Sequence, residues 1–112
     1  MNDESLVSTV SYNGGNEEWR TSNRTYHRLD GPAFISYDGS KQWIVEGKTH
    51  REDGPAVEWA NGINTWWLHN IEYENSTKWA AALLRTRHEP DDDEAVIKFL
   101  KPILQKQVQQ LI

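Results

Sequence analysis

The sequence lacks cysteine and any long hydrophobic run, and each absence excludes a class of protein. Among its 112 residues there is no Cys. Disulfides, thiol nucleophiles and cysteine-ligated metal centres are therefore excluded, and a reducing compartment is favoured. No apolar stretch approaches the roughly 20 residues of a membrane span, and the acidic segment Met1–Ser5 has no signal-peptide core. We therefore expect a cytoplasmic protein that does not enter membranes.

Positive charge is also scarce. The chain has 12 Lys and Arg against 17 Asp and Glu, which gives a net charge of −5. Without a general polycation to neutralise phosphates, direct nucleic-acid binding is not expected. Residues 1–75 contain six basic and twelve acidic residues, whereas residues 76–112 contain six and five. The acidic surface is thus predicted to belong to the first part of the chain.

A repeat organises that first part. The segment His27–Ala33 returns 23 positions later as His50–Ala56, and Trp43 returns at the same offset as Trp66. A degenerate copy upstream keeps the Gly-to-Trp spacing of Gly39 and Trp43. Fixed periods of this kind are typical of stacked units that cannot bury their apolar faces alone. The sequence predicts a partial unit at 6–25 and full units at 26–48 and 49–73.

Each unit has the pattern of a β-hairpin. Short alternating segments rich in Val, Ile, Tyr, Phe and Trp flank Asp-Gly or Asn-Gly, which supply the positive φ of tight hairpin turns. We expect strand pairs at 6–12 with 18–21, 33–37 with 41–46, and 56–60 with 64–69. The predicted fold class is α+β, mainly β: an antiparallel β-hairpin repeat meander of about six strands. Alternation places Trp43 and Trp66 in its core, aligned with Trp19 as a ladder.

Two helices are predicted in the C-terminal segment 76–112, which would cap the domain at 1–75. Ser76 is the expected N-cap of a helix over 77–87, and Asp91–Glu94 opens a second one. Pro102 should kink or restart that second helix. Its apolar positions recur at helical spacing and comprise Val96 or Ile97, Leu100, Leu104, Val108 and Leu111. This stripe either folds back on the sheet or pairs with its copy in a homodimer.

The repeated motif resembles a family of repeats. His-Arg-x-Asp-Gly-Pro-Ala, followed by Asp/Asn-Gly-x-x-x-Trp and x-Gly-Lys, is similar to the MORN-like hairpin repeat of small phage and large-virus proteins. The resemblance covers about 12–73, although Asn70 stands where the pattern has Gly, and the tail from Asp91 lies outside it. It implies a hairpin stack with an interaction role, a phage origin and no catalytic residues to carry over.

The repeated His and Asp residues are the first candidates for chemistry. Two pairs, His27 with Asp30 and His50 with Asp53, could bind a metal or exchange protons. Because both recur with the following turn, Gly31-Pro32 and Gly54-Pro55, we interpret them as structural: the Asp is a turn former, and Gly before Pro accepts the extended backbone. Arg28 and Arg51 are expected to pair with these acids or with Glu52. No metal site and no cofactor is predicted.

Other residues are not required by the repeat. Trp59 and Trp67 occupy positions equivalent to Ser36 and Ile44. They either anchor a protein interface, as aromatic residues often do, or pack under the helix that follows Ser76. The acidic run at 89–94 is either a solvated helix entry or a binding epitope or nucleic-acid mimic. The residues proposed as partner-binding are Trp59, Trp67, Glu58, His69, Asp91, Asp92 and Asp93.

Together these patterns favour a non-enzymatic protein-interaction module. In a phage setting, it would bind and inhibit a protein in the host cytoplasm, such as a defence or nucleic-acid-processing factor. Two alternatives stay open: a small metal-dependent hydrolase that uses the repeated His/Asp pairs, and a repeat that binds lipid surfaces. Templates for phosphate loops, nucleophile elbows and paired-His helices are all missing from the sequence.

Overall fold

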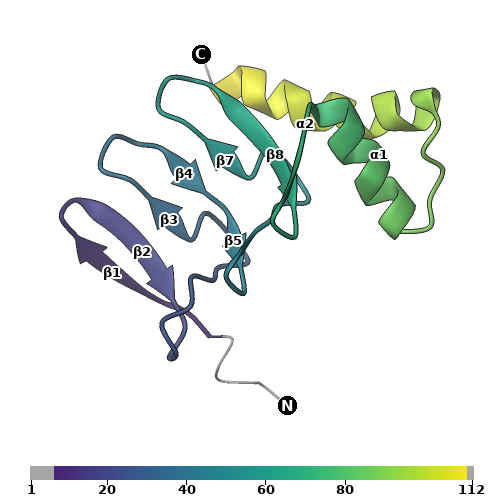
Figure 1. Ribbon diagram of the computed structural model, residues 1–112. Coiled ribbons are helices and arrows are strands. Elements are labelled where there is room, and N and C mark those ends of the chain that lie inside the picture. The colour runs from purple at the N-terminus through teal and green to yellow at the C-terminus, as the bar shows by residue number, and fades with distance from the viewer. Residues whose placement is uncertain (1–6, 111–112) are drawn as a thin grey trace.

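The repeats form hairpins that lie side by side and end against two helices (Figure 1). This computed structural model describes residues 7–110. Among them, the strands are β1 Thr9–Asn13, β2 Asn16–Arg20, β3 Phe34–Ile35, β4 Lys41–Gln42, β5 Ile44–Val45, β6 Lys48–Thr49, β7 Val57–Glu58, β8 Asn64–Leu68 and β9 Ile71–Tyr73. The helices are α1 Ser76–Thr86 and α2 Asp93–Gln110. The predicted class, a mainly antiparallel α+β fold with a C-terminal helical cap, is confirmed.

The sheet order follows the repeat. Seven strands pair in the order β1-β2-β3-β4-β7-β8-β9, and β5 pairs with β6 apart from them. These strand pairs are antiparallel, with Asn13 opposite Asn16 in the first hairpin and Trp66 opposite Tyr73 in the last. Leu6, where the first strand was predicted to start, lies outside the described residues. The hairpins at 33–46 and 56–69 are where the sequence predicts them.

The strand count differs from the predicted six, because the segment 41–46 changes partners at Trp43. The Trp43 N–H donates to the Ala56 carbonyl at 2.7 Å, and its own carbonyl accepts from the His50 N–H at 3.1 Å. Consequently β4 pairs with β7 of the next unit, whereas β5 pairs with β6, which spans the junction between the two units. After β5 and β8 the chain reverses and forms two further antiparallel strands, β6 and β9, which the sequence pattern does not indicate.

Left-handed turns produce these returns. Glu46 and Gly47 have φ of 50° and 79°, and the equivalent His69 and Asn70 have φ of 49° and 68°. Asn tolerates this conformation better than other residues with side chains. Asn70 therefore replaces the expected Gly without changing the turn, and its Oδ1 also accepts the Thr49 N–H at 2.7 Å.

The first helix begins one residue before the predicted start. Asn75 is its N-cap, and the Asn75 Oδ1 accepts the Lys78 N–H at 2.9 Å, so Ser76 is the first helical residue rather than the cap. Asx side chains cap as well as Ser does, which explains why the sequence alone did not separate the two. One face of α1 is apolar and buried, and it consists of Trp79, Ala80, Leu83 and Leu84.

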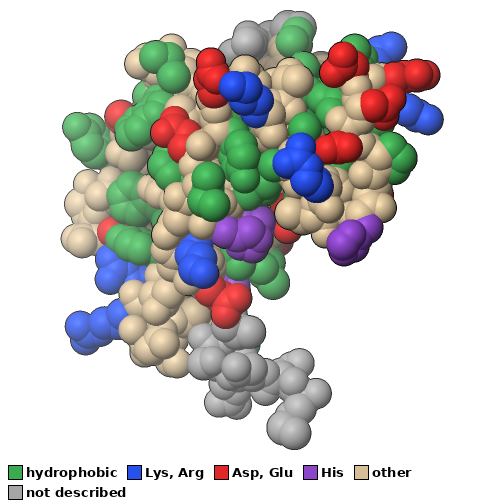
Figure 2. All heavy atoms as spheres, turned by 45° about the vertical axis from the view of Figure 1, so that its right-hand side comes forward, with side chains coloured by type: hydrophobic (Ala, Val, Ile, Leu, Met, Phe, Trp, Pro, Cys, Tyr) green, Lys and Arg blue, Asp and Glu red, His purple; other side chains and the backbone are tan. Residues whose placement is uncertain are grey.

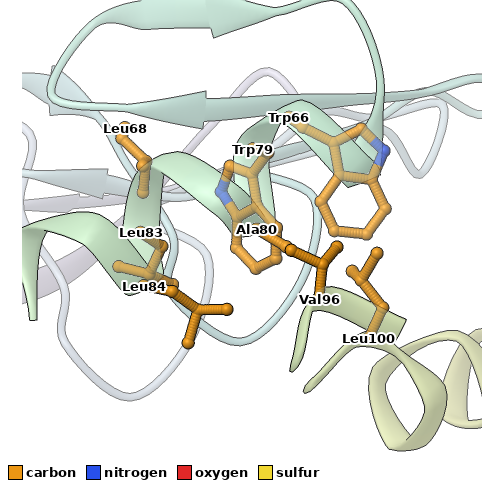
Figure 3. Packing of buried hydrophobic residues seen from close by; sticks show 8 residues of the cluster. All are labelled: Trp66, Leu68, Trp79, Ala80, Leu83, Leu84, Val96 and Leu100. Atoms are coloured by element: carbon orange, nitrogen blue, oxygen red, sulfur yellow. The ribbon is translucent and has the colours of Figure 1, made fainter. Parts of the chain in front are cut away.

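The main core lies between the last hairpin and the helices, where side chains from β8, α1 and α2 point toward one another (Figure 3). Trp79 is fully buried, and its ring lies 4.8 Å from the ring of Trp66. Val96 and Leu100 of α2 pack into the same cluster. The C-terminal segment is thus a cap that shares one core with the sheet.

Helix α2 runs as one helix through Pro102. Of the two outcomes expected at Pro102, a kink or a restart, the restart does not occur, and α2 starts at Asp93 rather than Asp91. The choice between Val96 and Ile97 is also resolved, because Val96 is 3% exposed and Ile97 is 66% exposed. Leu111 lies outside the described residues. Within residues 7–110, no helix combines the length and apolarity needed to cross a bilayer.

Candidate functional site

Each repeated histidine closes the turn of its own unit. His27 Nδ1 accepts the Glu46 N–H at 2.9 Å, and His50 Nδ1 accepts the His69 N–H at 3.0 Å. Both imidazoles are buried, with 3% and 8% exposed. Because Nδ1 is occupied as an acceptor, it is not free to bind a metal.

Each repeated arginine covers a tryptophan of the preceding unit. Arg28 lies 4.0 Å from the Trp19 ring centroid, and Arg51 lies 3.7 Å from that of Trp43. Trp43 is consequently half-buried under a guanidinium rather than enclosed in the apolar core. No Arg occurs at the next equivalent position, and the face of Trp66 is instead packed by Trp79 of α1. In the first two positions of the predicted Trp ladder, each Trp therefore stacks on the Arg of the next unit.

The Asp and Gly of the motif hold that arginine. Arg28 Nε donates to Asp30 at 2.9 Å, and Arg51 Nε donates to Asp53 at 2.8 Å, which confirms the predicted pairing. The same arginines donate from Nη1 to the carbonyls of Pro32 and Pro55.

Glycine in the motif makes room for the guanidinium. A Cβ on Gly54 would lie 2.7 Å from Arg51 Cζ, and one on Gly31 would lie 2.8 Å from Arg28 Cζ. The Arg, Asp and Gly of the repeated segment therefore act together in packing one unit on the next. The structural interpretation of the His/Asp pairs is supported by these contacts.

The second unit has a polar contact at Glu52 that the first unit lacks. His50 Nε2 lies 2.8 Å from Glu52 Oε2, and the other oxygen of Glu52 accepts from Arg87 at 3.0 Å. The hydrogen bonds from His50 and then Arg87 lower the pKa of the Glu52 carboxyl. In the preceding unit Leu29 occupies the position of Glu52. This ion pair thus ties the second unit to the end of α1.

A charged hollow of about 650 Å³ lies between the two motif loops. Its arginines are already paired: Arg28 with Asp30, Arg51 with Asp53, and Arg87 with Glu52. Acidic and basic side chains also alternate over the face seen in Figure 2, with hydrophobic side chains between them. Among the described residues no group of three or more His, Cys, Asp or Glu is placed to hold a metal ion. This hollow offers no free cation or ligand set.

The structure separates most of the residues predicted to bind a partner. Glu58 is half-buried and pairs with Arg51 at 3.0 Å. Trp67 is half-buried and donates to Thr65 Oγ1 at 2.8 Å, while the His69 ring lies 4.2 Å from that of His50. The three acids Asp91, Asp92 and Asp93 lie at the connection between α1 and α2, exposed to solvent. These residues do not form one surface.

Two of these residues, Glu58 and Trp59, lie together beside α2, and the exposed one is Trp59. Its side chain is 53% exposed and lines a hollow of about 780 Å³ together with Leu104 and Val108. Leu104 and Val108 form a ridge, because they also line a second groove, of about 760 Å³, together with Ile97 and the start of α1. We call Trp59, Ile97, Leu104 and Val108 the α2 patch.

The three α2 residues were identified in the sequence only as an apolar stripe in need of a cover. Their exposed fractions are 66% for Ile97, 39% for Leu104 and 59% for Val108. The C-terminal end of α2 approaches the turn between β7 and β8, which brings the stripe to Trp59 (Figure 1). This juxtaposition depends on how α2 docks, and sequence periodicity alone does not contain it.

No protein-family model, no curated protein and no solved structure matches the chain. The resemblance to MORN-like repeats therefore stays a prediction from the motif.

Proposed function

We propose that the chain is a non-enzymatic protein-binding module and that the α2 patch is its binding surface. The observation that carries this proposal is the convergence of four exposed apolar side chains from two elements around two adjoining hollows. Leu104 and Val108 line both hollows, so the surface is continuous across the ridge.

The composition of the patch fits a protein partner. Trp is the residue most enriched at the energetic centres of interfaces, and Trp59 is half-exposed beside an apolar helix face. The groove beside the start of α1 has one charged residue in its lining, Lys101, and interface cores are likewise depleted of charge. The hollow around Trp59 also has Asp38, Lys41 and Glu58 in its lining, which fits the polar rim of an interface.

The other two functions have less support. A hydrolase would need the repeated His/Asp pairs, but His27 and His50 accept backbone hydrogen bonds and Asp30 and Asp53 hold arginines. A lipid-binding role would also use the apolar side chains of α2, so the test must separate it from protein binding. The identity of the partner as a host protein stays a prediction.

The experiment compares two double variants as baits in a lysate of the cells that naturally make the protein. The test variant is Trp59→Ala with Val108→Gln. The matched control is Tyr37→Ala with Leu29→Gln, two side chains that are each 79% exposed and line neither hollow of the α2 patch. Far-UV circular dichroism establishes that both variants are folded.

We expect one stoichiometric partner on the wild-type chain and on the control. Its affinity for the test variant should fall about 10-fold or more, since each interface anchor contributes about 1–2 kcal/mol. Equal retention on the two variants would contradict the proposal. Flotation of the wild-type chain, but not of the test variant, with anionic vesicles would show that the α2 patch binds a lipid surface instead of a protein.

A further inference from the structure

Among residues 7–110, strand β1 forms one edge of the sheet and has no neighbour on its outer side. Within the described residues β1 pairs only with β2, and all five of its residues are exposed. The opposite edge, β9, contacts α1 and carries Glu72. A free strand edge presents unpaired N–H and C=O groups, and proteins usually protect it with charged residues, Pro or a bulge. Strand β1 has no charged residue and no Pro.

The register of the first hairpin determines which backbone groups are free. Asn13 lies opposite Asn16 across the two-residue turn Gly14-Gly15. A two-residue hairpin is closed by a hydrogen-bonded pair, and hydrogen-bonded and non-hydrogen-bonded pairs then alternate along the strand. The Ser11 backbone therefore points toward β2. The N–H and C=O groups of Val10 and Tyr12 point away from it, toward the open edge.

The pattern of β1 is complementary to itself. When two copies of the strand lie antiparallel about Ser11, Val10 of one copy is directly opposite Tyr12 of the other. These are the two residues with outward backbone groups, so the two symmetric pairs make four hydrogen bonds. Their side chains also share one face, because Val10 and Tyr12 are two positions apart. Aromatic and β-branched residues form favourable cross-strand pairs.

We propose that two copies of this chain associate through β1, in antiparallel register about Ser11, to form one continuous sheet. Val10 and Tyr12 are 38% and 74% exposed in the single copy, and the second copy would cover them. The inference does not depend on the α2 patch, which lies at the opposite end of the sheet (Figure 1). The dimer would leave both α2 patches open and present them as a pair, which can raise the avidity for a partner with two sites.

The absence of Cys makes the register directly testable, since each introduced Cys is then the sole thiol in its chain. In the proposed register Ser11 faces Ser11 of the second copy in a non-hydrogen-bonded pair, where Cα atoms are about 4.5 Å apart and a disulfide can form. Under mild oxidation we expect Ser11→Cys to cross-link about 10-fold faster than Ser22→Cys, a control at another exposed serine. The variant Leu104→Cys reports on association through α2.

Sedimentation of the full chain across a concentration series provides the second measurement. The wild-type chain and Ser22→Lys should approach the mass of a dimer as concentration rises. The variant Ser11→Lys should stay monomeric, because it places two like charges opposite each other. A wild-type chain that is monomeric at every concentration would overturn the proposal. So would a Ser11→Cys rate equal to that of Ser22→Cys, or a dimer that persists in Ser11→Lys and cross-links through Leu104→Cys.

Discussion

Replacement of Arg51 by Ala tests whether the repeated motif exists to hold one unit on the next. The Arg51 guanidinium stacks 3.7 Å from the Trp43 centroid and donates to the Pro55 carbonyl at 3.0 Å. It also pairs with Glu58 at 3.0 Å and with Asp53 at 2.8 Å. Only 15% of its side chain is exposed, so most of these contacts are shielded from water.

The expected loss in the free energy of unfolding follows from these contacts. A shielded cation–π contact contributes about 1–2 kcal/mol. The Pro55 carbonyl, in a fully buried residue, would lose its donor at a cost of about 1–3 kcal/mol. The pair with Asp53, which is 83% exposed, adds little. Because such terms are not fully additive, we expect Arg51→Ala to lower the free energy of unfolding by about 2–4 kcal/mol.

Arg28→Ala is the matched control for this magnitude. Its carbonyl contact with Pro32 is longer, at 3.3 Å, and its second acid, Glu17, is 3.7 Å away. The loss should therefore be about 1 kcal/mol smaller than for Arg51→Ala. Urea unfolding followed by Trp fluorescence measures both values. A loss below about 1 kcal/mol for Arg51→Ala, with the fold retained, would refute the structural role of the motif.

Three further predictions concern the cap and the polar contact beside it. Trp79→Ala should lower the free energy of unfolding by about 3–5 kcal/mol, because the ring is fully buried in the main core; a loss under about 2 kcal/mol in urea unfolding would contradict that burial. Glu52→Gln should make the free energy of unfolding fall less steeply as the pH drops below about 4.5. The hydrogen bonds of Glu52 with His50 and Arg87 lower the pKa of its carboxyl, so their contribution to stability is present above 4.5 and is lost as the carboxyl protonates. Measurements of the free energy of unfolding between acid and neutral pH check this. Pro102→Ala should raise the melting temperature, since Pro inside a helix removes a backbone donor at a cost of up to about 3 kcal/mol, and an unchanged temperature would show that α2 has already accommodated it.

The repeat allowed much of the fold to be predicted, because equivalent residues make equivalent contacts. His27 and His50 each bond the backbone of a turn 19 positions later, as the 23-residue offset requires. The change of strand partner at Trp43 was not predictable in the same way. It arises because that residue bonds Ala56 on one side and His50 on the other, and alternation along a single strand does not reveal a change of partner.

The site was less predictable than the fold. Trp59 was singled out because the repeat does not require it, and it does line the surface beside α2. Asp91 and its neighbours were singled out on charge, but the position of the α1–α2 connection decides what they face. The helical period also fits Val96 and Ile97 equally well, and only the docking of α2 against α1 buries one and exposes the other.

The central claim, that the α2 patch binds a protein, is tested most directly by site-specific cross-linking. A photoreactive amino acid is placed at Val108 in one chain and at Leu29 in another, two exposed positions on different parts of the surface. Both chains are irradiated in a lysate of the cells that naturally make the protein, and the adducts are identified by mass spectrometry. We expect one discrete protein adduct from position 108 and none from position 29. An adduct from position 29 alone, or the same adducts from both positions, would contradict it.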